Sequence, residues 1–119
     1  MSRIRWMAFV CAIFTGSLVA QQGYVVMAPD GPQFRFNNRT TRGWAARRET
    51  GNPRGGRDDI IFVENVLKAV ATRYNLAIEE TVVSGFSSGG SMAWHFSCYS
   101  KLPLGGVLAV AGGLRRPLP

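Results

Sequence analysis

The chain has 119 residues, of which 46% are hydrophobic and 18% are charged. This composition excludes an intrinsically disordered protein, and the length allows one domain at most. The net charge of +7 is compatible with an acidic partner, but no zinc-finger, helix-turn-helix or RNA-recognition pattern accompanies it, so we expect no nucleic-acid partner.

The first twenty residues are typical of an export signal. Arg3 and Arg5 give a positive start, an apolar run follows, and small residues end the run at Ala20. We therefore predict a signal peptide over residues 1–20 and a secreted or periplasmic protein. A membrane anchor is the alternative, because the uncharged run after Arg5 is borderline in length for a membrane span. We expect no other contact with a membrane.

The remainder, residues 21–119, opens with a short β-branched and apolar run at residues 23–28. Such a run predicts a strand that is covered on both faces, as in a parallel sheet. Residues 32–57 show no periodicity, and we predict a long loop there. This loop holds half of the positive side chains of the chain, namely Arg35, Arg39, Arg42, Arg47, Arg48, Arg54 and Arg57. They could hold anions or an acidic polymer, or they could form a solvated surface.

An amphipathic helix is predicted over about residues 58–74. Asp58 and Asp59 suit its amino terminus, apolar residues recur at spacings of three and four, and Asn75 is able to end it. A second strand at 81–84, a second helix over about 88–100 and a third strand at 106–111 follow. This alternation predicts an α/β fold with about three parallel strands and two crossover helices.

The turn after the second strand carries the chemistry. Gly85-Phe86-Ser87-Ser88-Gly89 has the G-x-S-x-G spacing that exposes a serine between a strand and a helix. Gly85 and Gly89 leave room for the tight turn, Ser87 is the expected nucleophile, and the backbone N–H of Ser88 is the expected oxyanion donor. A plain glycine turn is the alternative interpretation.

Five stretches of the chain resemble one family. Residues 85–94 resemble the nucleophile region of the polyhydroxybutyrate depolymerase-like esterases, to which feruloyl and acetylxylan esterases are related. Residues 23–31, 42–44, 57–62 and 110–119 resemble other pieces of that family in the same order. The resemblance implies a partial α/β-hydrolase domain over residues 21–119 that hydrolyses carboxylic esters through an acyl-enzyme on Ser87. It implies no cofactor and no metal. Trp44 and Arg42 are candidates for the substrate side, and the substrate is a polyester, an acylated polysaccharide or a small ester.

The same resemblance implies an Asp and then a His after the serine. No Asp follows Ser87, and the single histidine, His95, lies eight residues later on the same predicted helix. We expect His95 to be a surface or packed helix residue, and Asp30, Asp58 and Asp59 to serve turns and caps. The sequence therefore predicts an incomplete catalytic site. A non-catalytic hydrolase remnant or a membrane-tethered binding module is the alternative function.

The two cysteines predict no metal cluster, because no C-x-x-C pair is present. Cys11 lies in the predicted signal peptide. Cys98 is then left as a buried thiol or as half of a disulfide whose partner lies elsewhere.

Overall fold

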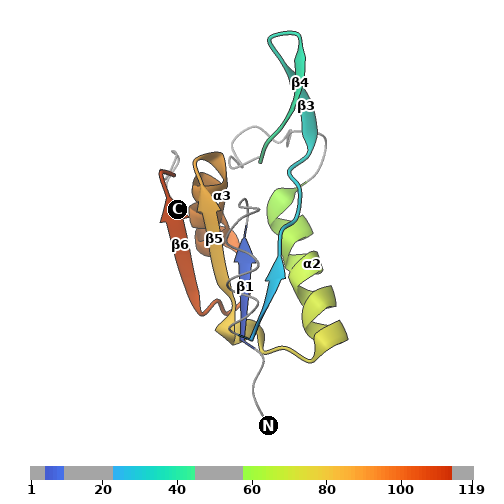
Figure 1. Cartoon of the computed structure of the whole chain (residues 1–119), viewed down its shortest axis with the longest axis vertical. Helices are drawn as coiled ribbons and strands as arrows, with labels where there is room; N and C mark the ends of the chain where they lie inside the picture. The colour runs from blue at the N-terminus through green and yellow to red at the C-terminus, as the bar shows by residue number, and fades with distance from the viewer. Residues whose placement is uncertain (1–4, 10–22, 45–57, 114–119) are drawn as a thin grey trace.

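A parallel sheet of four strands organises the structure, a computed structural model that describes residues 5–9, 23–44 and 58–113 (Figure 1). The strands lie in the order β2-β1-β5-β6, and every neighbouring pair is parallel. Their bounds are Arg5–Phe9 for β1, Tyr24–Met27 for β2, Val82–Phe86 for β5 and Gly106–Val110 for β6. The protein is thus a small α/β domain.

The predicted number of strands was too low. All three predicted stretches form strands, and β1 is a fourth that lies between β2 and β5. Met7 pairs with Val26 on one side and with Val82 on the other. The apolar run at the start of the chain was assigned to export because a buried strand and the core of a signal peptide share the same composition.

The predicted signal peptide overlaps β1, since residues 5–9 belong to both. The other residues of that segment, 1–4 and 10–20, lie outside the described residues, so cleavage after Ala20 stays a prediction. Cleavage there would remove the strand that joins β2 to β5. In the described part of the chain, no helix combines the length and the apolar character needed to cross a membrane.

Both predicted helices are confirmed within one or two residues. Helix α2 spans Asp59–Tyr74, and its cap Asp58 accepts hydrogen bonds from the N–H groups of Ile60 and Ile61 at 3.0 and 3.2 Å. Asn75 ends the helix in the left-handed conformation, as the sequence predicted. A short 3₁₀ turn, η2 (Ile78–Glu80), leads into β5, and helix α3 spans Ser88–Tyr99.

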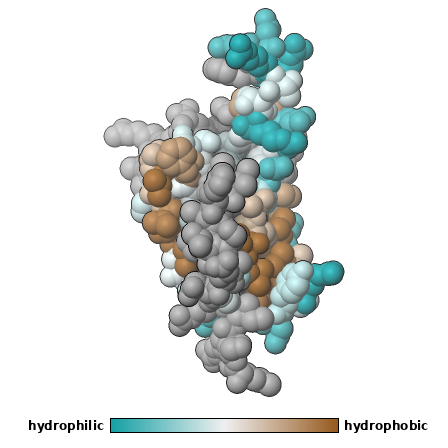
Figure 2. Space-filling view, in the orientation of Figure 1, coloured by the Kyte–Doolittle hydropathy of each residue, from teal (hydrophilic) through white to brown (hydrophobic). Residues whose placement is uncertain are grey.

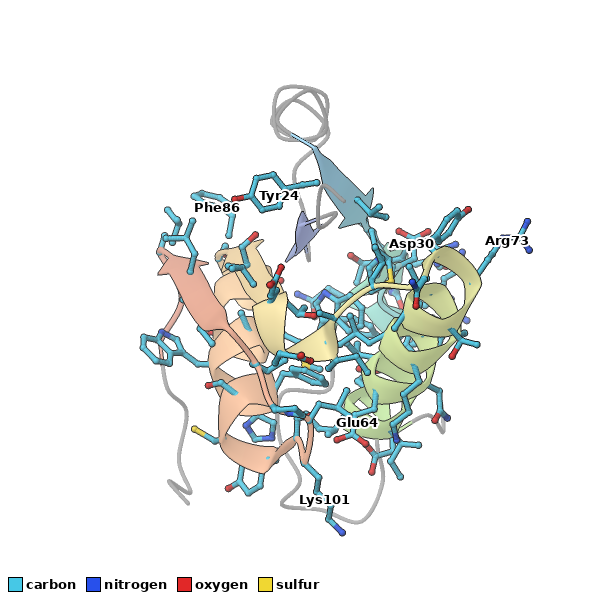
Figure 3. The ribbon with its side chains drawn as sticks, turned by 90° about the horizontal axis from the view of Figure 1, so that it is seen from below. Tyr24, Asp30, Glu64, Arg73, Phe86 and Lys101 are labelled. Carbon is cyan, nitrogen blue, oxygen red and sulfur yellow. The ribbon has the colours of Figure 1, made fainter. Side chains whose placement is uncertain are left out.

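The two helices lie on the same face of the sheet (Figure 3). The crossovers from β2 to β5 and from β5 to β6 run in the same direction across the sheet, so right-handed connections place α2 and α3 together. The core between them and the sheet is formed by the buried residues Ile60, Val63, Leu67, Ala71, Val83, Met92, Ala93 and Phe96. Because α3 packs against both β5 and β6, the start of this helix is fixed by two strands.

An antiparallel hairpin projects from the end of the domain, where a long loop was predicted (Figure 1). Its strands are β3 (Gln33–Phe36) and β4 (Arg39–Arg42). Asn37 and Asn38 join them with positive φ angles of 47° and 58°, which is the two-residue turn that fits the twist of a hairpin. Residues 45–57, the rest of the predicted loop, lie outside the described residues.

Candidate functional site

Ser87 lies between the last residue of β5 and the first residue of α3, and it is exposed. Its backbone has φ 52° and ψ −116°, a conformation that costs a residue with a side chain about 1–3 kcal/mol. Its N–H donates to the carbonyl of Val110 at 2.9 Å, and its carbonyl accepts from the N–H of Ser91 at 3.0 Å. Its hydroxyl makes no capping hydrogen bond with α3. The backbone of Ser87 is therefore held at both ends, while its hydroxyl is left for other chemistry.

Three glycines allow α3 to begin this close to the sheet. A Cβ on Gly85 would overlap the backbone of Gly89, and a Cβ on Gly112 would overlap that of Gly90 and Ser91. A Cβ on Gly90 would lie 3.0 Å from the Cα of Gly112. Gly112 was not among the site residues predicted from the sequence, although its position directly after a strand is typical of a close approach of this kind.

A hydrogen bond fixes the same contact from the other direction. The N–H of Gly113 donates to the Oγ of Ser91 at 3.2 Å, which ties the chain after β6 to the first turn of α3. Ser91 is buried, so its hydroxyl is a structural group. Ser88, by contrast, is exposed beside Ser87.

The start of α3 supplies amide hydrogens to this turn. The first hydrogen bond of the helix runs from the N–H of Ser91 to the carbonyl of Ser87. The N–H groups of residues 88–90 therefore have no acceptor within the helix. Such groups, together with the positive end of the helix dipole, favour an anion. The N–H of Ser88, the oxyanion donor predicted from the sequence, belongs to this set.

The sheet topology also favours this position for a ligand. From β1 the chain moves to β2 on one side, whereas from β5 it moves to β6 on the other side. In open parallel sheets, ligands bind beyond the carboxyl ends of the strands at such a change of direction. Ser87 directly follows β5, one of the two strands at this point.

The structure does not bring a base to Ser87 from the same helix. His95 is buried on α3, and its ring lies 4.6 Å from that of Tyr99. Eight residues of helix separate it from Ser87, which corresponds to about 12 Å along the axis. This agrees with the expectation of a packed helix residue.

The acidic residues singled out in the sequence lie elsewhere. Asp58 caps α2, and Asp59 beside it is buried. Asp30 is exposed at the base of the hairpin, 3.9 Å from Arg42. Among the described residues, no group of three or more His, Cys, Asp or Glu side chains is arranged to hold a metal ion.

Two further predicted site residues have different surroundings. Trp44 is only 8% exposed and packs with the core, so most of its ring is covered by protein, and its place on the substrate side stays a prediction. Arg42 is exposed and donates to the carbonyl of Gly31 at 3.3 Å. Cys98 is exposed and free, which rules out a buried thiol.

The comparisons with known proteins give no independent assignment. No protein-family model matches the chain, and no curated protein is significantly similar to it.

Proposed function

We propose that this domain is the nucleophile-bearing part of a serine hydrolase of carboxylic esters. The family is the one that the sequence resembles, the polyhydroxybutyrate depolymerase-like esterases with their feruloyl and acetylxylan relatives. The observation that carries the proposal is the strained backbone of Ser87 at an exposed strand-to-helix turn. Strain of this kind persists where the surrounding structure holds it, and it is concentrated at functional sites. The proposed parent fold is that of the α/β-hydrolases.

In the proposed reaction, the Oγ of Ser87 attacks the ester carbonyl carbon and loses its proton to a base. The negative charge moves to the carbonyl oxygen, where the N–H of Ser88 stabilises it. The alcohol leaves with a proton, and water then hydrolyses the acyl-enzyme by the same route. His95 is not placed to act as the base, so we propose that the base comes from outside α3.

A serine-directed fluorophosphonate probe tests this proposal. We expect covalent labelling of the folded chain that disappears in Ser87→Ala. The matched control is Ser88→Ala, which removes the neighbouring exposed hydroxyl but keeps its N–H, and which should still be labelled. Peptide mapping by mass spectrometry should place the adduct on Ser87.

The alternative is a non-catalytic hydrolase domain, or a tethered binding module built on it. The position of His95 favours this alternative, because this histidine packs beside Tyr99 and does not reach Ser87 to act as its base. Loss of a triad member commonly lowers the rate by about 10⁴-fold. Absence of labelling in a chain that unfolds cooperatively would support it and would refute the esterase proposal.

A further inference from the structure

The hairpin β3–β4 is an ordered arm with a basic surface. Its base is tied to the domain, since the N–H of Gly43 donates to the carbonyl of Pro32 at 3.2 Å and Arg42 donates to Gly31. A Cβ on Gly31 would lie 2.8 Å from the carbonyl oxygen of Gly43, so the backbone segments that enter and leave the hairpin are in contact there. The adjoining Trp44 is buried in the core. An isolated two-stranded hairpin is only marginally stable, so this arm depends on these contacts at its base for its fixed position.

Beyond this base the arm is exposed and positively charged. All four residues of β4 are exposed, and so is Arg35 on β3. The arm forms the hydrophilic upper end of the molecule in Figure 2. Asp30 lies near Arg42, but within the described structure neither Arg35 nor Arg39 has an ion-pair partner. The tip of the arm therefore presents two guanidinium groups to solvent.

The strand register shows how the three arginines are arranged. Arg35 pairs with Thr40 and Gln33 pairs with Arg42, so Arg35 and Arg42 lie on one face of the ribbon as diagonal neighbours. Diagonal neighbours are about 7–8 Å apart. Arg39 pairs with Phe36 on the opposite face, near the turn. Cations on both faces of a narrow ribbon suit a ligand with repeated anions better than a single small anion.

The arm and Ser87 lie at the same edge of the sheet. The arm follows the carboxyl end of β2, and Ser87 follows the carboxyl end of β5 (Figure 1). Only β1 separates these two strands, which corresponds to about 10 Å between strand axes. An extended polymer can therefore contact the arm while one of its units reaches Ser87.

We propose that the hairpin arm binds a polyanionic polysaccharide, with carboxylate groups repeated along the polymer, and presents it to the Ser87 turn. Guanidinium groups bind carboxylates through paired hydrogen bonds. Single-stranded nucleic acid is the less favoured polyanion, because its binding relies on exposed aromatic rings. Phe34, the aromatic residue of the arm whose side chain is described, is half-buried. The identity of the polymer as an ester substrate rests on the proposed function, whereas its binding to the arm does not.

Binding is measured with polygalacturonate as the probe and with Ser87→Ala as the parent protein, so that no turnover occurs. The double variant Arg35→Gln/Arg39→Gln removes the two charges at the tip and leaves Arg42 in place. The control Arg73→Gln/Lys101→Gln removes the same net charge from exposed positions at the end of α2 and after α3 (Figure 3).

For the tip variant we expect about tenfold weaker binding at moderate salt and a slope of log affinity against log salt that is smaller by about 2. The control should change both quantities little. Equal losses in the two variants would show that only the net charge matters and would overturn the proposal. Tighter binding of poly(U) RNA than of polygalacturonate at the same salt would also overturn it, in favour of nucleic acid.

The substrate part is tested separately with the wild-type serine. On acetylated polygalacturonate, the tip variant should lose about tenfold in kcat/KM, while its hydrolysis of a neutral small acetate ester should be unchanged. Equal rates of tip variant and parent on the polymer would refute this part. Failure of the proposed function is distinguishable, because it abolishes labelling of Ser87 and leaves polymer binding intact.

Discussion

The contact between Gly112 and the start of α3 gives the sharpest test of the structure. In Gly112→Ala, the new Cβ would lie 2.5 Å from the Cα of Gly90 and closer still to two other backbone atoms. Ordinary contact begins at 3.4 Å. The helix and the end of β6 must therefore separate by about 1 Å, which also stretches the bond between Gly113 and Ser91.

Overpacking of this kind costs about 1–3 kcal/mol, and we expect the upper end because backbone atoms, unlike side chains, have no rotamer to change. With an unfolding entropy of about 2.1 cal/mol/K per residue, 3 kcal/mol corresponds to a fall in Tm of about 12 °C for this chain. The assay is urea and thermal unfolding followed by circular dichroism.

The adjacent glycine is the matched control. A Cβ on Gly113 meets nothing within 4 Å, so Gly113→Ala should change the free energy of unfolding by less than about 0.5 kcal/mol. If Gly112→Ala and Gly113→Ala unfold with the same free energy, α3 does not begin against β6 as described, and the geometry assigned to Ser87 is wrong.

Three further predictions concern stability. Ser87→Gly should be about 1 kcal/mol more stable than Ser87→Ala in urea unfolding, because glycine relieves the strain at φ 52°; equal values would mean that no strain is stored there. Asp58→Ala should lower the free energy of unfolding by about 1 kcal/mol because it removes the cap hydrogen bonds to α2, whereas Asp58→Asn should keep most of that stability. The same loss in both variants would argue against the cap. Deletion of residues 1–20 should abolish cooperative thermal unfolding, because β2 and β5 each lose a paired edge, and a deleted chain that melts like the full chain would exclude β1 from the sheet.

The elements that the sequence predicted well are those defined by local interactions. Asp58, Asn75 and the apolar stripe between them determine α2 without reference to the rest of the chain. The turn at Ser87 was likewise predictable, because glycines at fixed spacing between a strand and a helix allow few backbone paths.

The elements that it missed depend on partners far along the chain. Nothing within residues 5–9 distinguishes a central strand from an export signal. What makes this segment a strand is its pairing with β2 and β5, which lie later in the chain. The hairpin did carry a local signal in Asn37-Asn38, two residues that accept positive φ, but the surrounding arginines suggested a solvated loop. The burial of Trp44 follows from how the hairpin is attached, which no local pattern records.

The position of β1 has a consequence for how the chain folds as it is synthesised. This strand leaves the ribosome before the other strands of the sheet and can pair with β2 soon afterwards, but its other edge stays unpaired until β5 has been made. During that interval an unpaired edge is open to other chains, and joining strands so distant in sequence is intrinsically slow. Docking of β5 onto β1 is thus the step at which a nascent chain is most exposed to aggregation, and chaperones that shield strand edges should raise the yield of folded protein.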